Sequence, residues 1–137
     1  LKIAGSGPDE AALRQLAGGD PRIEFLGFVK DRELIDLYAN ARAVPYVPYQ
    51  EDYGLITVEA MMSGKPVLTV TDAGGPTELV VDGENGYVVA PESAALAARI
   101  DELCDHPAEC RRMGDNGRQR VARITWADTV AAILQGA

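Results

Sequence analysis

The sequence predicts an α/β fold, a Rossmann-like parallel sheet with helices on both faces. Its 137 residues match the size of one domain, and 47% of them are hydrophobic, which is enough to bury a core. Short apolar stretches alternate with stretches in which apolar residues recur at helical spacing, and glycine- and proline-rich turns separate the two. We therefore expect the sheet within about residues 1–90 and a helical tail over about residues 91–137.

Five strands and four intervening helices are predicted in the sheet region. The strands are expected at residues 1–4, 23–26, 43–47, 67–71 and 86–89. A first helix has Pro8 in its first turn, where the fixed φ of proline suits it, and a second is capped by Asp31. A third helix covers residues 54–62, and a short fourth helix covers residues 76–80.

The tail is predicted to contain three helices. The first is capped by Ser93, and the second covers residues 108–123. Thr125-Trp126-Ala127-Asp128 resembles a capping box, and it opens a last helix that carries Trp126, Val130 and Ile133 on one side. We expect this apolar side to pack on structure outside the chain or, if it is exposed, to favour self-association.

The composition excludes several classes of partner. With 13 basic and 21 acidic residues, the chain has a net charge of −8 and no broad positive surface for nucleic acid or anionic membrane. Cys104 and Cys110 have only His106 nearby, too few ligands for a structural zinc site, so no metal is expected. Reduced thiols predict a reducing compartment, the cytoplasm. No apolar run approaches the length of about 18 residues that spans a membrane.

Ligands of such sheets bind beyond the carboxyl ends of the strands, so the loops after the strands are the candidate sites. The first is Gly5-Ser6-Gly7-Pro8, whose two glycines suggest a GxGxxG dinucleotide fingerprint. However, Glu10 stands where the third glycine is needed, and Pro8 has no amide hydrogen. A tight turn that allows a neighbour to approach closely is the favoured interpretation.

The second candidate is the helix over residues 54–62. It is apolar nearly all round and is predicted to be buried. One face carries Leu55, Val58, Glu59 and Met62, so a carboxylate lies within an apolar stripe. Because burying a lone carboxylate costs several kcal/mol, Glu59 needs a hydrogen-bonding partner from the protein or from a ligand.

The start of this helix suits a nucleotide diphosphate. Free amides around Gly54 and Leu55, together with the helix dipole, would bind the phosphates. Glu59 points back toward the helix start, where it would accept hydrogen bonds from a ribose diol, and Glu51 would contact the group on the second phosphate. Alternatively, Glu59 pairs with a buried arginine or a backbone amide, while Glu51 and Asp52 are surface or helix-start charges.

The third candidate is the loop over residues 71–78, which follows a predicted strand at the same edge of the sheet. Its glycines, Gly74 and Gly75, and the start of the next helix would present amides to a sugar or phosphate. The alternative is a plain turn in which Glu78 is a helix-start charge.

The spacing of Glu51 and Glu59, with Tyr53-Gly54-Leu55 between them, resembles the E-x7-E motif of retaining GT-B glycosyltransferases. Further matching motifs, in the family's order, are Ala4-Gly5-Ser6-Gly7-Pro8, Phe25-Leu26-Gly27-Phe28-Val29, Gly64-Lys65-Pro66-Val67, Gly74-Gly75-Pro76-x-Glu78-Leu79-Val80 and Asp82-Gly83-x-Asn85-Gly86. Over residues 1 to about 90, the chain thus resembles the C-terminal, donor-binding domain of a family 4 enzyme, glycosyltransferase group 1.

This resemblance implies an enzyme that transfers a sugar from a nucleotide-diphosphate sugar to an acceptor, with retention of configuration and with no metal or other cofactor. It implies that Glu51 is the candidate catalytic residue, which contacts sugar hydroxyls near the anomeric carbon, and that Glu59 binds the ribose. The other implied donor-binding residues are Gly54 and Leu55 at the diphosphate, Tyr53 beside them, Phe28 and Val29 at the base, Gly5 and Gly7 in the cleft, and Gly74 and Gly75 in a nearby loop.

One part of the family's pattern has no match. In the family, an arginine and a lysine that bind the diphosphate precede the strand at residues 1–4, and Lys2, Lys30 and Arg32 are not at their positions. We therefore expect a piece of a longer polypeptide, without the first strand and helix of this domain and without the N-terminal acceptor-binding domain, and inactive by itself. The expected strand order is 3-2-1-4-5-6, so either the remaining strands close the central gap or another segment fills it.

Two other functions stay open at this point. Sugar-nucleotide 2-epimerases share the architecture, although Tyr53-Gly54-Leu55 within the motif argues against one. A non-catalytic flavodoxin-like interaction domain would be favoured if a buried arginine neutralised Glu59. The parent enzyme is expected in the cytoplasm, with peripheral attachment at the inner membrane face as an alternative.

Overall fold

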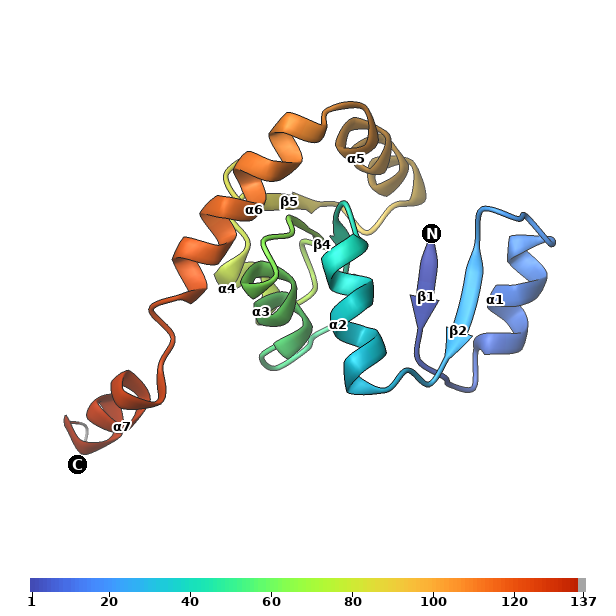
Figure 1. Ribbon diagram of the computed structural model, residues 1–137. Helices are drawn as coiled ribbons and strands as arrows, with labels where there is room; N and C mark the ends of the chain where they lie inside the picture. Colours follow the sequence, from blue (N-terminus) through green and yellow to red (C-terminus); the bar gives the residue numbers. More distant parts are fainter. Residues whose placement is uncertain (136–137) are drawn as a thin grey trace. The chain divides into compact units, whose positions relative to one another are not determined.

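The computed structural model describes residues 1–135 and confirms the α/β class (Figure 1). The strands are β1 (Lys2–Ala4), β2 (Glu24–Gly27), β3 (Val44–Pro45), β4 (Val67–Val70) and β5 (Gly86–Val89). The helices are α1 (Glu10–Ala17), α2 (Asp31–Asn40), α3 (Leu55–Met62), α4 (Pro76–Leu79), α5 (Ser93–Asp105), α6 (Pro107–Val121) and α7 (Trp126–Gln135). Every predicted strand and helix is present, although several ends are shifted.

All five strands pair in parallel, as predicted, and they form two sheets rather than one. β1 pairs with β2 within a compact unit of residues 1–37. In the unit that begins at Tyr38, β4 is central and pairs with β3 on one side and β5 on the other. Because these strands are parallel, the loops that follow β3, β4 and β5 all lie at the same edge of their sheet.

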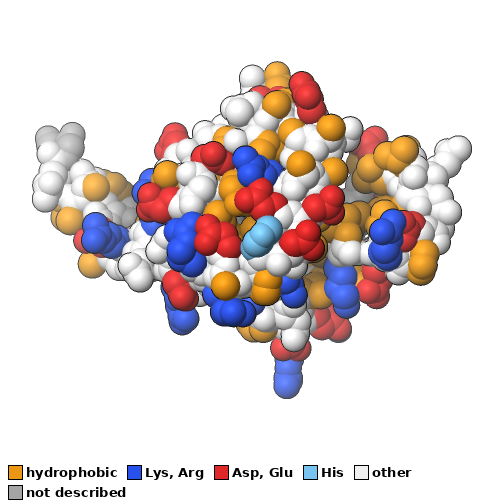
Figure 2. Space-filling model, turned by 90° about the horizontal axis from the view of Figure 1, so that it is seen from above, with side chains coloured by type: hydrophobic (Ala, Val, Ile, Leu, Met, Phe, Trp, Pro, Cys, Tyr) orange, Lys and Arg blue, Asp and Glu red, His pale blue; other side chains and the backbone are white. Residues whose placement is uncertain are grey.

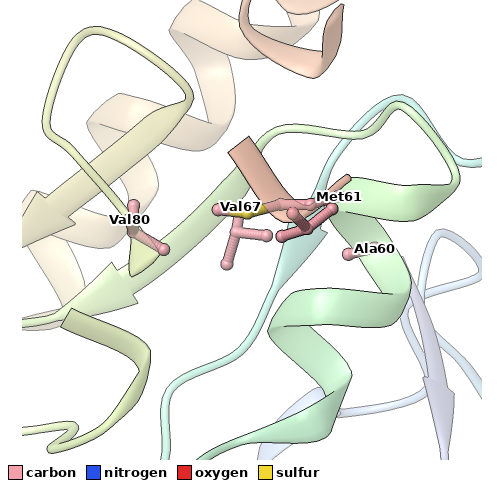
Figure 3. Close-up of a cluster of buried hydrophobic side chains, with 5 residues drawn as sticks. Ala60, Met61, Val67 and Val80 are labelled. Carbon is pink, nitrogen blue, oxygen red and sulfur yellow. The ribbon is translucent and has the colours of Figure 1, made fainter. Parts of the chain in front are cut away.

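β4 is buried along its whole length, and its two faces meet two separate clusters of apolar side chains. Val67 packs with Ala60, Met61, Val80 and Val121, from α3, α6 and the segment after α4 (Figure 3). Leu68 packs with Tyr87, Leu103, Cys110 and Met113, from β5, α5 and α6. Successive strand residues point to opposite faces, so helices cover both faces of this sheet, as predicted.

The unit of residues 1–37 contains no buried residue, in contrast to the unit that begins at Tyr38. The prediction that Pro8 lies in the first helical turn is wrong, because α1 begins at Glu10. The amide of Glu10 instead donates to the carbonyl of Gly7 at 3.2 Å. This bond closes a turn with Pro8 in its second position, where the fixed φ of proline is also favoured.

β3 is shorter than the predicted strand over residues 43–47. Its regular pairing with β4 covers only Val44 and Pro45, followed by one hydrogen bond from the amide of Tyr46 to the carbonyl of Leu68 at 2.9 Å. Every second residue donates to β4, from Val44 and then Tyr46, and the next would be Pro48, which has no amide hydrogen, so the ladder ends there.

The predicted cap of α7 by Thr125 is confirmed, although within residues 1–135 the Thr125 amide makes no bond to Asp128 that would complete a capping box. The amide of Asp128 donates to Oγ1 of Thr125 at 3.2 Å, and that hydroxyl donates to the Asp128 carboxylate at 2.7 Å. The apolar side of α7 is exposed, with Trp126 at 85% and Ile133 at 66%. Among the helices of residues 1–135, none combines the length and the apolar character needed to cross a membrane.

Candidate functional site

Each glutamate of the E-x7-E pattern accepts a hydrogen bond from a tyrosine that lies outside the pattern. Glu51 is in the loop after β3, and the hydroxyl of Tyr46 donates to its Oε2 at 3.1 Å. Glu59 is on α3, and the hydroxyl of Tyr38, on α2, donates to its Oε2 at 2.9 Å. Both tyrosines and Glu51 are half-buried, while Glu59 is exposed.

The prediction that α3 is buried nearly all round is wrong, and so is the prediction of a buried stripe around Glu59. Ala60 and Met61 are fully buried, whereas Leu55 and Met62 are 64% and 62% exposed. One face of α3 packs on the sheet, and an apolar composition all round does not specify which face that is. The cost of burying a carboxylate therefore does not explain the partner of Glu59.

The loop that carries Glu51 pairs along its backbone with the glycine-rich loop after β4. The amide of Glu51 donates to the carbonyl of Ala73 at 2.8 Å, and the amide of Gly75 donates to the carbonyl of Glu51 at 2.8 Å. A Cβ at Gly74 would overlap the carbonyl oxygen of Glu51, and one at Gly75 would overlap that of Asp52. The two glycines thus let the second and third candidate loops meet, and this contact positions Glu51.

The start of α3 has the features of an anion site. Gly54 precedes the helix with φ of +73°, and a Cβ there would lie 2.8 Å from Cγ of Pro76. Only glycine combines this left-handed conformation with such a close approach. The amides of Leu55 and Ile56 donate no backbone hydrogen bond within residues 1–135. These amides and the helix dipole are available to a negatively charged group.

The two glutamates carry charge that no cation of the described chain neutralises. None of the ion pairs within residues 1–135 involves Glu51 or Glu59. Burial, followed by the hydrogen bond to Glu59, raises the pKa of the Tyr38 hydroxyl above its ordinary value. Burial and the bond to Glu51 do the same to the pKa of Tyr46. Both phenols therefore stay protonated at neutral pH and act as donors.

Four predicted site residues belong to the unit of residues 1–37. Gly5 has φ of +115°, and its amide donates to the carbonyl of Gly27 at 2.7 Å. A Cβ on Gly7 would meet nothing within 4 Å. Phe28 is 84% exposed and Val29 is half-buried, so the phenyl ring is open to a partner. In the other unit, Tyr53 is 46% exposed beside Gly54.

Two hollows of the surface lie away from this site. One of about 570 Å³ lies between the end of α6 and the segment after α4, lined by residues that include Leu79, Arg120 and Ile124. None of the predicted site residues lines it. In residues 1–135, no group of three or more His, Cys, Asp and Glu side chains is placed to hold a metal.

Acidic and basic side chains are interspersed on the face that Figure 2 shows, and no broad field of Lys and Arg covers it. The sequence motifs did not single out Tyr38 and Tyr46 as site residues, since Tyr38 follows Asp31 in a predicted helix and Tyr46 lies in the strand predicted at residues 43–47. No local signal distinguishes a tyrosine that donates to a distant carboxylate from one that only packs.

The parallel α/β fold, with two motif glutamates beside a glycine-packed helix start, fits the GT-B glycosyltransferase class that the sequence motifs resemble. A family model described as glycosyl transferases group 1 matches residues 1–120, so the chain belongs to this family. It is 36% identical over 104 residues to alpha-1,3/1,6-mannosyltransferase ALG2 of Dictyostelium discoideum, a match that covers 76% of this chain and 24% of that protein. It is 33% identical over 132 residues to MMP alpha-(1->4)-mannosyltransferase of Mycolicibacterium hassiacum, covering 96% of this chain and 32% of that protein.

Solved structures give the same result for the fold. Sucrose-phosphate synthase from Thermosynechococcus elongatus matches with a TM-score of 0.82 and 32% identity, over 98% of this chain and 37% of that one. HepE from Anabaena, in complex with UDP-glucose, matches with a TM-score of 0.81 and 29% identity, over 99% of this chain and 40% of that one. The chain thus spans well under half the length of these relatives.

Proposed function

We propose that the chain is the donor-binding part of a retaining glycosyltransferase, which moves a sugar from a nucleotide-diphosphate sugar to an acceptor. In this proposal an acceptor-binding domain, N-terminal in the same polypeptide, completes the active site, and the chain has no turnover alone. The proposal locates the enzyme in the cytoplasm, a reducing compartment that suits the free thiols of Cys104 and Cys110.

The observation that carries this proposal is the state of the two motif carboxylates. Glu51 and Glu59 each accept one tyrosine hydrogen bond, and neither is paired with a cation in the described part of the chain. Each therefore retains acceptor capacity for the hydroxyls of a ligand. A buried arginine on Glu59, which would favour an interaction domain, is not present in residues 1–135. Membership of the glycosyltransferase family disfavours the 2-epimerase alternative.

Each predicted site residue has a role in the proposal. Glu59 accepts hydrogen bonds from the ribose diol, and Glu51 contacts sugar hydroxyls near the anomeric carbon. The other donor-binding residues are Gly54, Leu55 and Tyr53 at the diphosphate, Phe28 and Val29 at the base, Gly5 and Gly7 lining the cleft, and Gly74 and Gly75 supporting the loop of Glu51. The complex of HepE with UDP-glucose, at 29% identity, supports a nucleotide-diphosphate sugar as the ligand class.

The start of α3 supplies the chemistry that the transfer needs. When the bond to the sugar breaks, negative charge develops on the departing diphosphate. Free amides at Leu55 and Ile56 and the positive end of the helix dipole stabilise that charge. The proposal therefore requires no divalent metal and no other cofactor.

Titration calorimetry of the chain with UDP, GDP and ADP tests this function. We expect one nucleotide to bind and Glu59→Ala to weaken it about tenfold or more, because each hydrogen bond to a charged acceptor contributes about 1.5–3 kcal/mol. Glu92→Ala is the matched control, because Glu92 is an exposed glutamate that makes no side-chain cap hydrogen bond at the start of α5.

An equal loss in Glu59→Ala and Glu92→Ala would contradict the assignment of Glu59. If the folded chain binds none of the three nucleotides, the titration is repeated on the polypeptide extended upstream to include the expected arginine and lysine. Failure of that longer polypeptide to bind would overturn the proposed function itself.

A further inference from the structure

Tyr38 and Tyr46 each donate a hydrogen bond to one of the two motif glutamates. Each donates its hydroxyl to Oε2 of one carboxylate, at 2.9 Å for Tyr38 with Glu59 and at 3.1 Å for Tyr46 with Glu51. The two tyrosines come from different elements, α2 and the segment after β3, and both are half-buried. Two separate parts of the fold therefore each direct a phenol at one carboxylate of the site.

A phenol can orient a carboxylate and still leave one of its two oxygens free for a ligand. It has one O–H, so it binds a single carboxylate oxygen, whereas an arginine fork binds both oxygens and neutralises the charge. In residues 1–135, no other hydrogen bond or ion pair engages Glu51 or Glu59 through its side chain. The Oε1 atom of each glutamate is thus left to a ligand.

The ring of Tyr46 is itself held at the start of α3. Its Cε1 atom lies 3.1 Å from the position that a Cβ on Gly54 would occupy, so the absence of that side chain makes room for the ring. Tyr46 therefore packs beside Gly54, and its hydroxyl reaches Glu51 from there. The same glycine that shapes the helix start also seats the tyrosine.

We infer that Tyr38 and Tyr46 are positioning residues of the donor site, Tyr38 for Glu59 at the nucleotide and Tyr46 for Glu51 at the sugar. This inference rests on the proposed function. A free glutamate side chain loses rotamer freedom when it binds, and a hydrogen bond made in advance removes part of that cost. The tyrosines thus act on ligand affinity through the glutamates and without touching the ligand.

The two tyrosines are expected to affect different parts of the ligand, so titrations with and without the sugar distinguish their roles. The probes are UDP and UDP-glucose, titrated into the chain by calorimetry. Tyr38→Phe is expected to weaken both probes by a similar factor, about three- to tenfold, because Glu59 serves the nucleotide part. Tyr46→Phe is expected to leave UDP unchanged and to reduce the affinity advantage of UDP-glucose over UDP.

Tyr87→Phe is a matched control for loss of a phenol. The hydroxyl of Tyr87 also donates to a glutamate, Oε1 of Glu102 at 2.7 Å, but this pair joins β5 to α5. Tyr87→Phe is expected to leave both affinities unchanged. A second arm places Tyr38→Phe in the Glu59→Ala background, where it is expected to cause no further loss, since residues that act through one another are not additive.

Three results decide the inference. If Glu59→Ala loses affinity while Tyr38→Phe and Tyr46→Phe bind both probes as the wild type does, the proposed function stands and the positioning role is overturned. If Tyr38→Phe costs as much in the Glu59→Ala background as alone, it acts by another route, and the inference is again overturned. If the folded wild type binds neither probe but binds GDP or ADP, the same variants are titrated with that nucleotide and its glucose conjugate, with the same expected outcomes. If it binds none of the three nucleotides, even in the polypeptide extended upstream, the proposed function and the positioning role fail together.

Discussion

The unit of residues 1–37 and the unit from Tyr38 on are built from the same strand–helix–strand pattern, yet they differ sharply in burial. No residue of the first unit is buried, whereas all four residues of β4 in the second unit are. The second unit also has two clusters of buried apolar side chains, one for each face of β4. A local pattern thus specifies an element, but the burial around that element decides how much stability it contributes.

The residues proposed to bind the donor differ in the same way, each within its own unit. Glu51, Glu59 and the loops that meet at Gly74 and Gly75 belong to the unit with the buried core, while Phe28 and Val29 belong to the other. Regions with few buried apolar contacts open more readily. We therefore expect the residues proposed for the sugar and the phosphates to be held more rigidly within their unit than those proposed for the base.

Leu68→Ala, in the centre of β4, is expected to have the largest effect. Leu68 is fully buried, so the substitution leaves a cavity and is expected to lower the free energy of unfolding by about 4 kcal/mol. Leu13→Ala, on α1, is the counterpart in the other unit, and with Leu13 46% exposed the expected loss is below about 1 kcal/mol. Urea unfolding followed by circular dichroism measures both, and equal losses would break the comparison.

Gly86→Ala is expected to have the second-largest effect on stability, because it acts on the pairing of β4 with β5. A Cβ on Gly86 would overlap the carbonyl oxygen of Val67, so the strands must separate, at an expected cost of about 3 kcal/mol. Gly7→Ala is its control, since nothing lies within 4 Å of that position and its φ is not left-handed. We expect Gly7→Ala to change stability by less than about 0.5 kcal/mol, and a larger loss would show that the first unit is packed more tightly than its burial indicates.

The elements were predictable from sequence because their signals are local. The helix cap at Thr125 and the apolar runs of β4 and β5 each act within a few residues. The motif spacing between Glu51 and Glu59 is equally local. Such features need no knowledge of what the chain packs against, and the structure has each of them where it was expected.

The features that the sequence did not predict correctly depend on contacts between distant segments. The buried face of α3 is chosen by the sheet and by α6, so an apolar composition all round left it undetermined. Tyr38 and Glu59 are 21 residues apart, and their hydrogen bond exists only because α2 and α3 meet. The close approach of Gly74 to the carbonyl of Glu51 is of the same kind. The spacing of the two motif glutamates was thus recognisable in the sequence, while the contacts that hold those glutamates in place were not.

Asn85→Ala is expected to have a smaller effect than the core substitutions. Asn85 is fully buried, its Oδ1 accepts from the amide of Val81 at 2.8 Å, and its Nδ2 donates to the carbonyl of Leu79 at 3.0 Å. Alanine leaves both backbone groups unpaired, at an expected cost of about 2 kcal/mol. Urea unfolding measures it, and Asn85→Asp, which keeps only the acceptor, is expected to be more destabilised at pH 7 than near the ordinary carboxyl pKa. A neutral Asn85→Ala would mean that water replaces both bonds.

Asp20→Asn tests a side chain that holds a turn in the first unit through hydrogen bonds, as Asn85 does in the second. This substitution is expected to have the smallest effect on stability. The carboxylate of Asp20 accepts from the amide of Arg22 at 2.9 Å and from its guanidinium at 2.7 Å. These hydrogen bonds lower the pKa of Asp20 from 3.8 to about 2. Because the folded value lies below the unfolded one, the stabilisation is present above about pH 4 and is lost as the pH falls toward 2.

We therefore expect Asp20→Asn to lower the urea midpoint slightly at neutral pH and not at all near pH 2, where the wild-type carboxylate is itself becoming protonated. The effect is small because the pair is exposed to water, which screens its charges. A loss at neutral pH as large as that of Asn85→Ala would contradict the comparison. It would mean that one surface ion pair holds the turn before β2 as firmly as a buried side chain holds the turn before β5, so that burial is not what separates the two units.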